Sequence, residues 1–529
     1  MINEMKIEKN MRKFLLCNIL QIICYIGNAE NANILAIFPV RLKSHLTMAM
    51  KIAEGLSANG HTVDLYNGFR DGKLGEGINQ ILVPDAKDMI LPSEFIGSQK
   101  ISIVERITAM FEYINAGNDQ CRNILSTSND VMNKLRNTKK HYDLILIELF
   151  LYDCFFGFAH SIKAPIVAMT SSVDLPWGAN RIGNPDNPSY IPIYHTSLGK
   201  DMTLFERIYN TFALMYGKYR HRLSLQTQQQ IAEEFFGSDV PSLNNIISNT
   251  SLFLLNSHFS LNQARPNLPN VIEVAGLHIG ELKPLSKEFL DIIGDSKFIY
   301  FSFGSVFKSE AITTDKLQHI CDAFEKLNYP VLWKADKKDI PKGLVVPKNV
   351  YTKRWMPQLD ILCHPNILFF MTHSGLMGTE EAVYCGVPML SIPLFADQFL
   401  NSKNVQDKGI AIAVELDKVS NLISDLMKEL IENPKYKQNA KKLSEEFKDR
   451  PKKPLDEAVY WIEYVLRHKG APQLKSKSVD LVWYQYYLLD VGGIILFLLI
   501  ISLTVIYKTF KYSLKCMKRK KGVNDKKKQ

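Results

Sequence analysis

The segment from Trp355 to Gln398 constrains the fold more than any other part of the 529-residue chain. Two apolar runs typical of buried strands, Ile367–Met371 and Pro388–Ile392, alternate with a glycine-containing turn and a helical pattern. Polar residues stand where these strands end. In an open α/β sheet, that edge binds ligands, and the helix N-termini beside it favour anions such as phosphates. The segment therefore predicts half of a site for a phosphate-containing ligand.

Strand and helix patterns alternate in both halves of the chain, which predicts parallel sheets. The first half opens with an apolar run at Ile34–Phe38, a helical pattern at Leu46–Asn59 and a second apolar run at Thr62–Tyr66. The other predicted strands are Leu144–Ile147, Ile166–Met169, Leu252–Asn256, Phe298–Ser302 and Val331–Lys334. Neither half has a GxGxxG motif after its first strand, so a dinucleotide-dependent oxidoreductase is not supported.

Two stretches resemble the UDP-glycosyltransferase family of animal membrane-bound enzymes. The sequence THSGLMGTEEAVYCGVP, within the first stretch, is most similar to insect members, and WIEYVLRHKGA at Trp461–Ala471 resembles the family's C-terminal region. The resemblance extends from about residue 33 to the end of the chain. It implies the GT-B fold, in which two Rossmann-like, doubly wound α/β domains face each other across a cleft.

The resemblance also implies a set of residues that bind the UDP-sugar donor. Trp355 would stack on uracil, Glu381 would accept from ribose hydroxyls, and His373 would hold the diphosphate at a helix start. Gln358 would bind the ribose or the base edge. Ser305 and the backbone at Ser374 and Gly375 would bind phosphate, and Asp397 and Gln398 would bind the sugar hydroxyls. Ser374 stands where the family often has glycine, and Met377 replaces a frequent asparagine. We interpret both departures as tuning.

His45, in PVRLKSHL after the first strand, matches the family's catalytic base. An imidazole suits the removal of a proton from an acceptor hydroxyl near neutral pH. Such a base needs an acidic partner that fixes its tautomer. The family's aspartate follows the strand that matches Tyr142–Ile147, and strict register puts Glu148 at its position, with Asp153 five residues further on. We slightly favour Asp153 and keep Glu148 as the alternative.

The resemblance implies an inverting hexosyl transfer that requires no metal and no prosthetic group. The insect-like segment favours UDP-glucose as donor, although Arg265 could face a glucuronate carboxylate. Aromatic stretches at Phe150–Phe158 and Tyr209–Tyr219 suggest small lipophilic acceptors, as in detoxification, and are equally well explained as core. The alternatives are a UDP-glucuronosyltransferase, a nucleotide-sugar epimerase, and a pseudo-transferase that binds sugar nucleotides or lipophiles without catalysis.

The two ends of the chain indicate membrane targeting. Basic residues precede the apolar run Phe14–Gly27, as in a secretory signal peptide, with a retained N-terminal anchor as the alternative. Val491–Tyr507 is apolar and uncharged, and the following residues 508–529 carry +9 of the chain's net charge of +10. This asymmetry predicts that the tail is cytosolic and that the part of the chain before the apolar run is lumenal. It also argues against nucleic-acid binding. Lys526–Gln529 resembles a dilysine signal for the endoplasmic reticulum.

These observations divide the chain into seven parts. We expect a signal peptide at 1–29, an acceptor-binding domain at 30–275, a linker at 276–290, a UDP-sugar-binding domain at 291–470, a juxtamembrane segment at 471–489, a transmembrane helix at 490–507 and a basic tail at 508–529.

Five widely spaced cysteines in the lumenal part do not suggest a disulfide framework. Asn249 begins the only glycosylation sequon. A homo- or heterodimer remains open.

Overall fold

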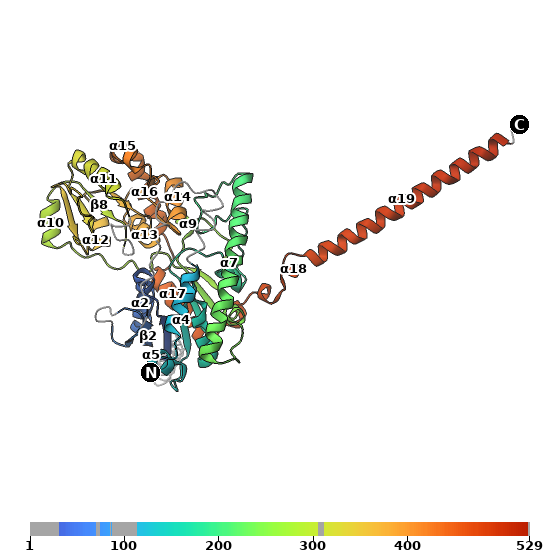
Figure 1. Ribbon diagram of the computed structural model, residues 1–529, viewed down its shortest axis with the longest axis horizontal. Coiled ribbons are helices and arrows are strands. Elements are labelled where there is room, and N and C mark those ends of the chain that lie inside the picture. The colour runs from blue at the N-terminus through green and yellow to red at the C-terminus, as the bar shows by residue number, and fades with distance from the viewer. Residues whose placement is uncertain (1–30, 70–74, 85, 87–113, 305–311, 527–529) are drawn as a thin grey trace, which may run out of the picture. The chain divides into compact units, whose positions relative to one another are not determined.

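The computed structural model describes residues 31–69, 75–84, 86, 114–304 and 312–526 (Figure 1). The predicted signal peptide and Ser305 lie outside these residues. The described residues form two compact units, which divide between Lys475 and Ser476.

The first sheet has seven parallel strands in the order β3-β2-β1-β4-β5-β6-β7. The strand order reverses between β1 and β4, so the carboxyl ends of these two strands flank a crevice. The strands are β1 (Asn33–Phe38), β2 (Thr62–Asn67), β3 (Ile78–Leu82), β4 (Leu144–Glu148), β5 (Ile166–Thr170), β6 (Leu252–Leu255) and β7 (Val271–Glu273). The strands β1, β4, β5 and β6 are almost wholly buried, as expected for a parallel sheet covered on both faces.

Helices cover both faces of this sheet, and the longest, α7, begins with a capping box at Thr203 and Glu206. The helices and short 3₁₀ turns are α2 (Lys43–Ala58), α4 (Ile114–Ile124), α5 (Asp130–Arg136), η2 (Asp153–Phe156), α6 (Gly157–Ile162), η3 (Ala179–Ile182), α7 (Leu204–Phe236), α8 (Leu243–Ser248) and α9 (Phe259–Asn262).

The second sheet has six parallel strands in the order β10-β9-β8-β11-β12-β13. Its strands are β8 (Phe298–Ser302), β9 (Val331–Lys334), β10 (Val350–Lys353), β11 (Ile367–Thr372), β12 (Met389–Ser391) and β13 (Ala411–Ala413). Its helices are α10 (Lys287–Ile293), α11 (Thr314–Leu327), α12 (Gln358–Leu362), α13 (Leu376–Tyr384), α14 (Gln398–Asp407), α15 (Val419–Glu432) and α16 (Pro434–Lys448). Two doubly wound parallel sheets confirm the predicted fold class.

The helix α17 (Pro454–Arg467) crosses back to the first sheet. Its buried residues Val459 and Ile462 join the core around α2, and a Cβ on Gly55 would lie only 2.8 Å from Val459. This close approach requires glycine in α2. The predicted limit of the second domain at residue 470 therefore differs from the packing, which assigns α17 to the first domain.

Two disulfides correct the expectation drawn from the cysteines. Cys121 in α4 pairs with Cys154 in η2, and Cys363 pairs with Cys385 at the ends of α12 and α13. Cys321 is buried and unpaired. The fold brings together cysteines that are far apart in sequence, which an odd and scattered count could not reveal.

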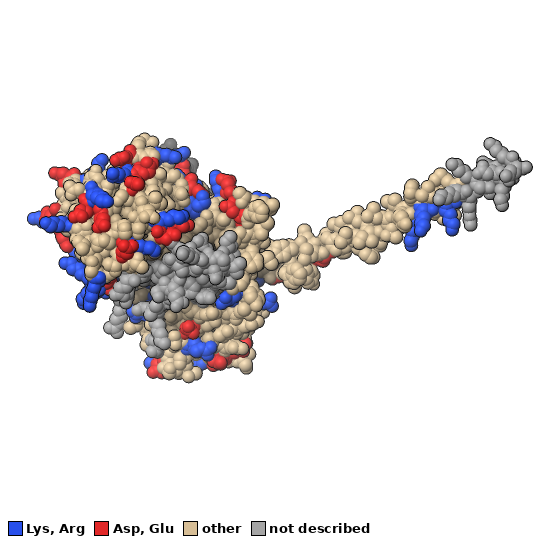
Figure 2. All heavy atoms as spheres, turned by 45° about the horizontal axis from the view of Figure 1, so that its top comes forward, with Lys and Arg blue, Asp and Glu red and all other residues tan. Residues whose placement is uncertain are grey.

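The second unit contains the 3₁₀ turn η6 (Lys477–Asp480), α18 (Trp483–Tyr486) and α19 (Leu489–Lys526). The stretch Leu489–Met517 contains an 18-residue window with a mean hydropathy of 2.6 and is long enough to cross a membrane. Figure 2 shows basic side chains toward the C-terminal end of α19, whereas basic and acidic side chains alternate over the visible face of the first unit. These features are consistent with a single-pass membrane protein.

Candidate active site

His45 lies in the first turn of α2, directly after β1, and its ring is hydrogen-bonded to the last residue of β4. The distance from His45 Nδ1 to Glu148 Oε1 is 2.6 Å. The pairing of β1 with β4 brings the two residues together across the point where the strand order reverses. Because Nδ1 faces the carboxylate, Nε2 is the atom left to act as a base, which is the arrangement of a His–acid pair.

The carboxylate of Glu148 is buried and has several hydrogen-bond donors. The Tyr152 hydroxyl donates to Oε2, and Ser171 Oγ donates to Oε1 at 3.3 Å. The ring of Phe150 meets the His45 ring edge-on, with centroids 4.7 Å apart. These contacts hold both members of the pair in one orientation.

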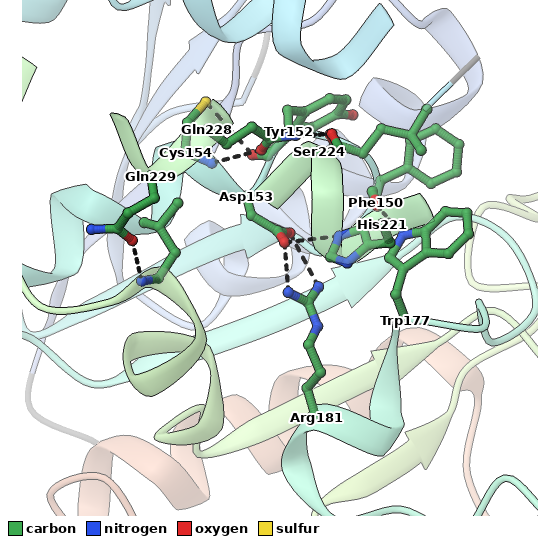
Figure 3. Close-up of polar contacts among 12 residues, drawn as sticks. Phe150, Tyr152, Asp153, Cys154, Trp177, Arg181, His221, Ser224, Gln228 and Gln229 are labelled. Atoms are coloured by element: carbon green, nitrogen blue, oxygen red, sulfur yellow. Dashed lines mark hydrogen bonds and ion pairs between the residues drawn. The ribbon is translucent and has the colours of Figure 1, made fainter. Parts of the chain in front are cut away.

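Asp153 is slightly favoured from the sequence as the partner of His45, but Glu148 is the carboxylate that bonds His45, and Asp153 bonds Arg181 and His221 instead (Figure 3). Asp153 Oδ2 lies 2.5 Å from Arg181 Nη1 and 3.1 Å from His221 Nε2. Burial alone would raise the pKa of Asp153, but the charges of Arg181 and His221 hold it below its usual range. At the start of η2, Asp153 points into the protein, because β4 ends five residues earlier and the chain turns inward.

One cavity of about 740 Å³ is lined by residues from both sheets. The first domain contributes His45, Phe150 and Ser171, among others. Predicted donor-site residues from the second domain also line it, namely Trp355, Gln358, His373, Gly375, Glu381, Asp397 and Gln398. The volume is within the range of small-molecule sites.

Trp355 follows β10 and is 58% exposed, so its indole is open to a stacking partner. Two ammonium groups lie over this ring, Lys43 Nζ at 4.5 Å and Lys334 Nζ at 4.9 Å from its centroid. Lys43 belongs to α2 and Lys334 to β9, so this cation–π cluster joins the two domains. The sequence did not single out either lysine.

Gln358 and Glu381 form one hydrogen-bonded unit. Gln358 Nε2 donates to Glu381 Oε2 at 2.6 Å, and the Tyr300 hydroxyl donates to Gln358 Oε1 at 3.1 Å. Burial raises the pKa of Glu381 to about 7, although its hydrogen bond from Gln358 and the charge of Lys334 oppose this. Its ionisation therefore changes near neutral pH.

His373 follows β11, and its half-buried ring lies between two glycines. A Cβ on Gly304 would be 2.7 Å from the ring, and a Cβ on Gly375 would be 2.6 Å from Nε2. Burial and the nearby charge of Lys334 lower the pKa of His373 to about 4. A neutral ring carries one N–H, which can donate a hydrogen bond to a phosphate oxygen.

Gly375 is the N-cap of α13, so the first backbone N–H groups of that helix open onto the cavity. The prediction for Ser374 concerns its backbone, which would hold the diphosphate beside Gly375. Ser374 has a left-handed φ of 62° and is fully buried, with its hydroxyl bonded to Ser391 Oγ. The left-handed conformation explains why glycine suits this position. Its side chain does not line the cavity.

Asp397 and Gln398 begin α14 opposite the first domain. Asn401 Nδ2 donates to Asp397 Oδ2 at 2.8 Å, and Gln398 Oε1 accepts from the backbone of Leu394 at 2.8 Å. Burial raises the pKa of Asp397 to about 6, against the hydrogen bond from Asn401 and the proximity of His45. The two side chains thus face the His45 wall across the cavity.

His278, in the connection between the sheets, is a site residue that the sequence did not indicate. Its Nε2 lies 3.2 Å from the Met377 carbonyl and 3.6 Å from Glu381, and its Nδ1 lies 3.5 Å from Glu380. Burial lowers the pKa of His278 to about 4. A G-x-H sequence in a Pro/Gly-rich connection was the available signal.

Two suggestions about substrate contacts do not match the geometry. Arg265 is half-buried, with the charges of Asp174 and Glu273 nearby, and it does not line the cavity. Within the stretch Tyr209–Tyr219, the side chains of Phe212, Met215 and Tyr219 are more than half exposed, and none of them lines the cavity either.

Comparison with known proteins gives consistent matches. A family model described as UDP-glucoronosyl and UDP-glucosyl transferase matches residues 85–529. UDP-glycosyltransferase UGT5 of Dactylopius coccus is 37% identical over 94% of this chain and 95% of its own length, and UDP-glucosyltransferase 2 of the same insect is 34% identical over 88% and 90%. The crystal structure of UDP-glucose: anthocyanidin 3-O-glucosyltransferase in complex with UDP has the same GT-B fold, with a TM-score of 0.54 at 17% identity over 83% of this chain and 100% of that one.

Proposed function

Because the chain belongs to the UDP-glucosyl and UDP-glucuronosyl transferase family, we propose that it transfers glucose from UDP-glucose to a hydroxyl of small lipophilic acceptors. The family membership makes it a UDP-glycosyltransferase and makes a UDP-sugar its donor. The sugar, the acceptor and the residue roles are what the proposal adds.

The observation that carries the proposal is the His45–Glu148 hydrogen bond on the wall that faces the donor-site residues. His45 Nε2 takes the proton of the acceptor hydroxyl as its oxygen attacks the anomeric carbon. The bond from that carbon to the UDP oxygen breaks, and UDP leaves on the opposite side, so the configuration inverts. Glu148 stabilises the imidazolium that forms.

The second domain would hold the leaving group. Trp355 stacks on uracil, and Glu381 with Gln358 accepts and donates at the ribose. The N-terminus of α13 and the neutral ring of His373 donate to the diphosphate, and Lys334, a half-buried cation, lines the same cavity. We retain the expectation that transfer needs no metal, which chelation by EDTA would test.

The choice of a neutral hexose rests on Asp397 and on Arg265. A carboxylate at Asp397 can accept from sugar hydroxyls but would repel a glucuronate, and Arg265 does not line the cavity and so cannot compensate. UDP-glucosyltransferase 2 of Dactylopius coccus also acts on a glucosyl donor by name. Glucuronate stays the second candidate, because the family model includes glucuronosyl transferases.

The acceptor class rests on the apolar part of the cavity. Leu42, Phe150, Leu151 and Phe395 line it together with the hydroxyls of Ser172 and Tyr194. Such a wall suits small lipophilic molecules that carry a hydroxyl group.

We further propose that the first unit lies in the lumen of the endoplasmic reticulum, with a cytosolic tail. One apolar helix followed by basic residues supports this orientation. Two disulfides also suit an oxidising compartment.

The test uses microsomes from cells that express the full chain. They are incubated with UDP-[14C]glucose and a broad panel of phenols, and His45→Ala is compared with His141→Ala, which removes an exposed histidine outside the cavity. We expect radioactive conjugates from the native chain and the His141 variant only. UDP binding without any conjugate would overturn the proposal in favour of a pseudo-transferase, and conjugates formed only from UDP-glucuronate would overturn the sugar.

A further inference from the structure

The segment Leu149–Asp153, which follows β4, carries two side chains that touch the His45–Glu148 pair. The Tyr152 hydroxyl donates to Glu148, and the Phe150 ring packs against the His45 ring. The position of this segment therefore sets the orientation of both members of the pair.

A buried polar cluster holds the far end of this segment (Figure 3). Asp153 is fully buried and bonds Arg181 of η3 through both carboxylate oxygens, at 2.5 and 3.1 Å. His221 of α7 lies 3.1 Å from the same carboxylate, and the Trp177 indole stacks on the His221 ring with centroids 5.2 Å apart.

The same cluster also fixes the middle of the segment. Trp177 Nε1 donates to the Phe150 carbonyl at 2.6 Å. Gln228 of α7 donates to the Leu151 carbonyl at 2.8 Å and accepts from the Cys154 amide at 3.2 Å. Three separate elements thus determine the backbone between Glu148 and Cys154.

None of Asp153, Arg181 and His221 lines the cavity, so none can touch a substrate. A buried carboxylate is tolerated only when it is paired, and its removal leaves a buried guanidinium without its counter-ion. The effect of such a change would reach the cavity through Phe150 and Tyr152.

We propose that Asp153, Arg181 and His221 are positioning residues of the transfer reaction, which hold Leu149–Asp153 so that Tyr152 and Phe150 orient Glu148 and His45. The inference rests on the proposed function, in which His45 is the base. Asp153 therefore acts through the acid of the pair and does not replace it.

The test measures kcat and KM with UDP-glucose for the full-length chain in membranes, in a double-mutant cycle of Asp153→Asn and Glu148→Gln. We expect Asp153→Asn alone to lower kcat by roughly 10- to 100-fold, as for misplacement of a catalytic group by about 1 Å. In the Glu148→Gln background, the same change should cost less than about threefold, because coupled residues are not additive. Arg181→Lys, which keeps the charge, should retain part of kcat.

Binding of UDP, measured by calorimetry on the solubilised full chain, shows whether each variant is folded. If Asp153→Asn does not bind UDP, Trp177→Phe decides the question, since it removes the hydrogen bond to Phe150 and keeps an aromatic ring beside His221. Folded variants with unchanged kcat would overturn the proposal. So would a double variant whose loss in kcat equals the product of the losses in Asp153→Asn and Glu148→Gln. His45→Ala is measured in the same series. Full activity of His45→Ala would mean that the proposed function fails, whereas an inactive His45→Ala confines a negative result to the positioning residues.

Discussion

Replacing Glu148 with glutamine tests the catalytic pair most sharply. The substitution keeps the size of the side chain, and the amide oxygen can still accept from His45 Nδ1–H. It removes the negative charge that lies 2.6 Å from the ring. The amide nitrogen must then face the Tyr152 hydroxyl, which at present donates to the carboxylate.

The expected magnitude follows from the charge. A carboxylate and an imidazolium whose charge centres are about 4 Å apart interact by about 4 kcal/mol at an effective dielectric constant of about 20. At about 1.4 kcal/mol for each factor of ten, kcat should fall roughly 1,000-fold. The donor site lies in the other domain, so KM for UDP-glucose should change by less than about threefold.

The assay is initial-rate conjugation of a phenol by membranes that contain the full chain. Asp64→Asn is the matched control, because Asp64 is also a buried carboxylate that accepts from a tyrosine hydroxyl, at 2.6 Å from Tyr142, and it does not line the cavity. The control should lose stability and keep its kcat. A Glu148→Gln enzyme with more than about a third of native kcat, while His45→Ala is inactive, would refute the role of Glu148.

Three further changes test the donor site and the topology. Because the pKa of Glu381 is raised to about 7 and its ionised form accepts from ribose, affinity for UDP should rise about tenfold between pH 6 and pH 8 and then level off; calorimetry should show this rise in the native chain and its loss in Glu381→Gln. Gly375→Ala puts a Cβ 2.6 Å from His373 Nε2, so KM for UDP-glucose should increase roughly tenfold or more, whereas alanine at Gly280, which meets nothing within 4 Å, should leave it unchanged. A lumenal Asn249, which is exposed, should carry a glycan that an endoglycosidase removes and that Asn249→Gln lacks; absence of the glycan in both would contradict lumenal exposure.

Much of the fold could be predicted because the central strands are buried on both faces and stand out as apolar runs. Phe298–Ser302 was predicted with the bounds that the structure has. The strands β7 and β13, with three residues each, and the partly exposed β3 and β10 were missed, since too few residues carry a pattern. The domain against which α17 packs is determined by its contact with Gly55. This contact is long-range, so no local sequence pattern predicts it.

The site residues could be predicted where position along the chain determines which way a side chain points. Strand register, matched to the family's aspartate, indicated Glu148, and the structure places it against His45. Asp153 was favoured for its chemistry, but burial and Arg181 decide where it points. The direction of Ser374 depends on its left-handed backbone, and the lysines around Trp355 come from two domains.

The configuration of the product at its anomeric carbon tests the central claim most directly. The proton NMR spectrum of a phenol glucoside made from α-configured UDP-glucose distinguishes the two outcomes. A single displacement with His45 as base predicts the β-glucoside only, formed by the native chain and absent with His45→Ala. An α-glucoside, or a β-glucoside formed equally well without His45, would contradict the account.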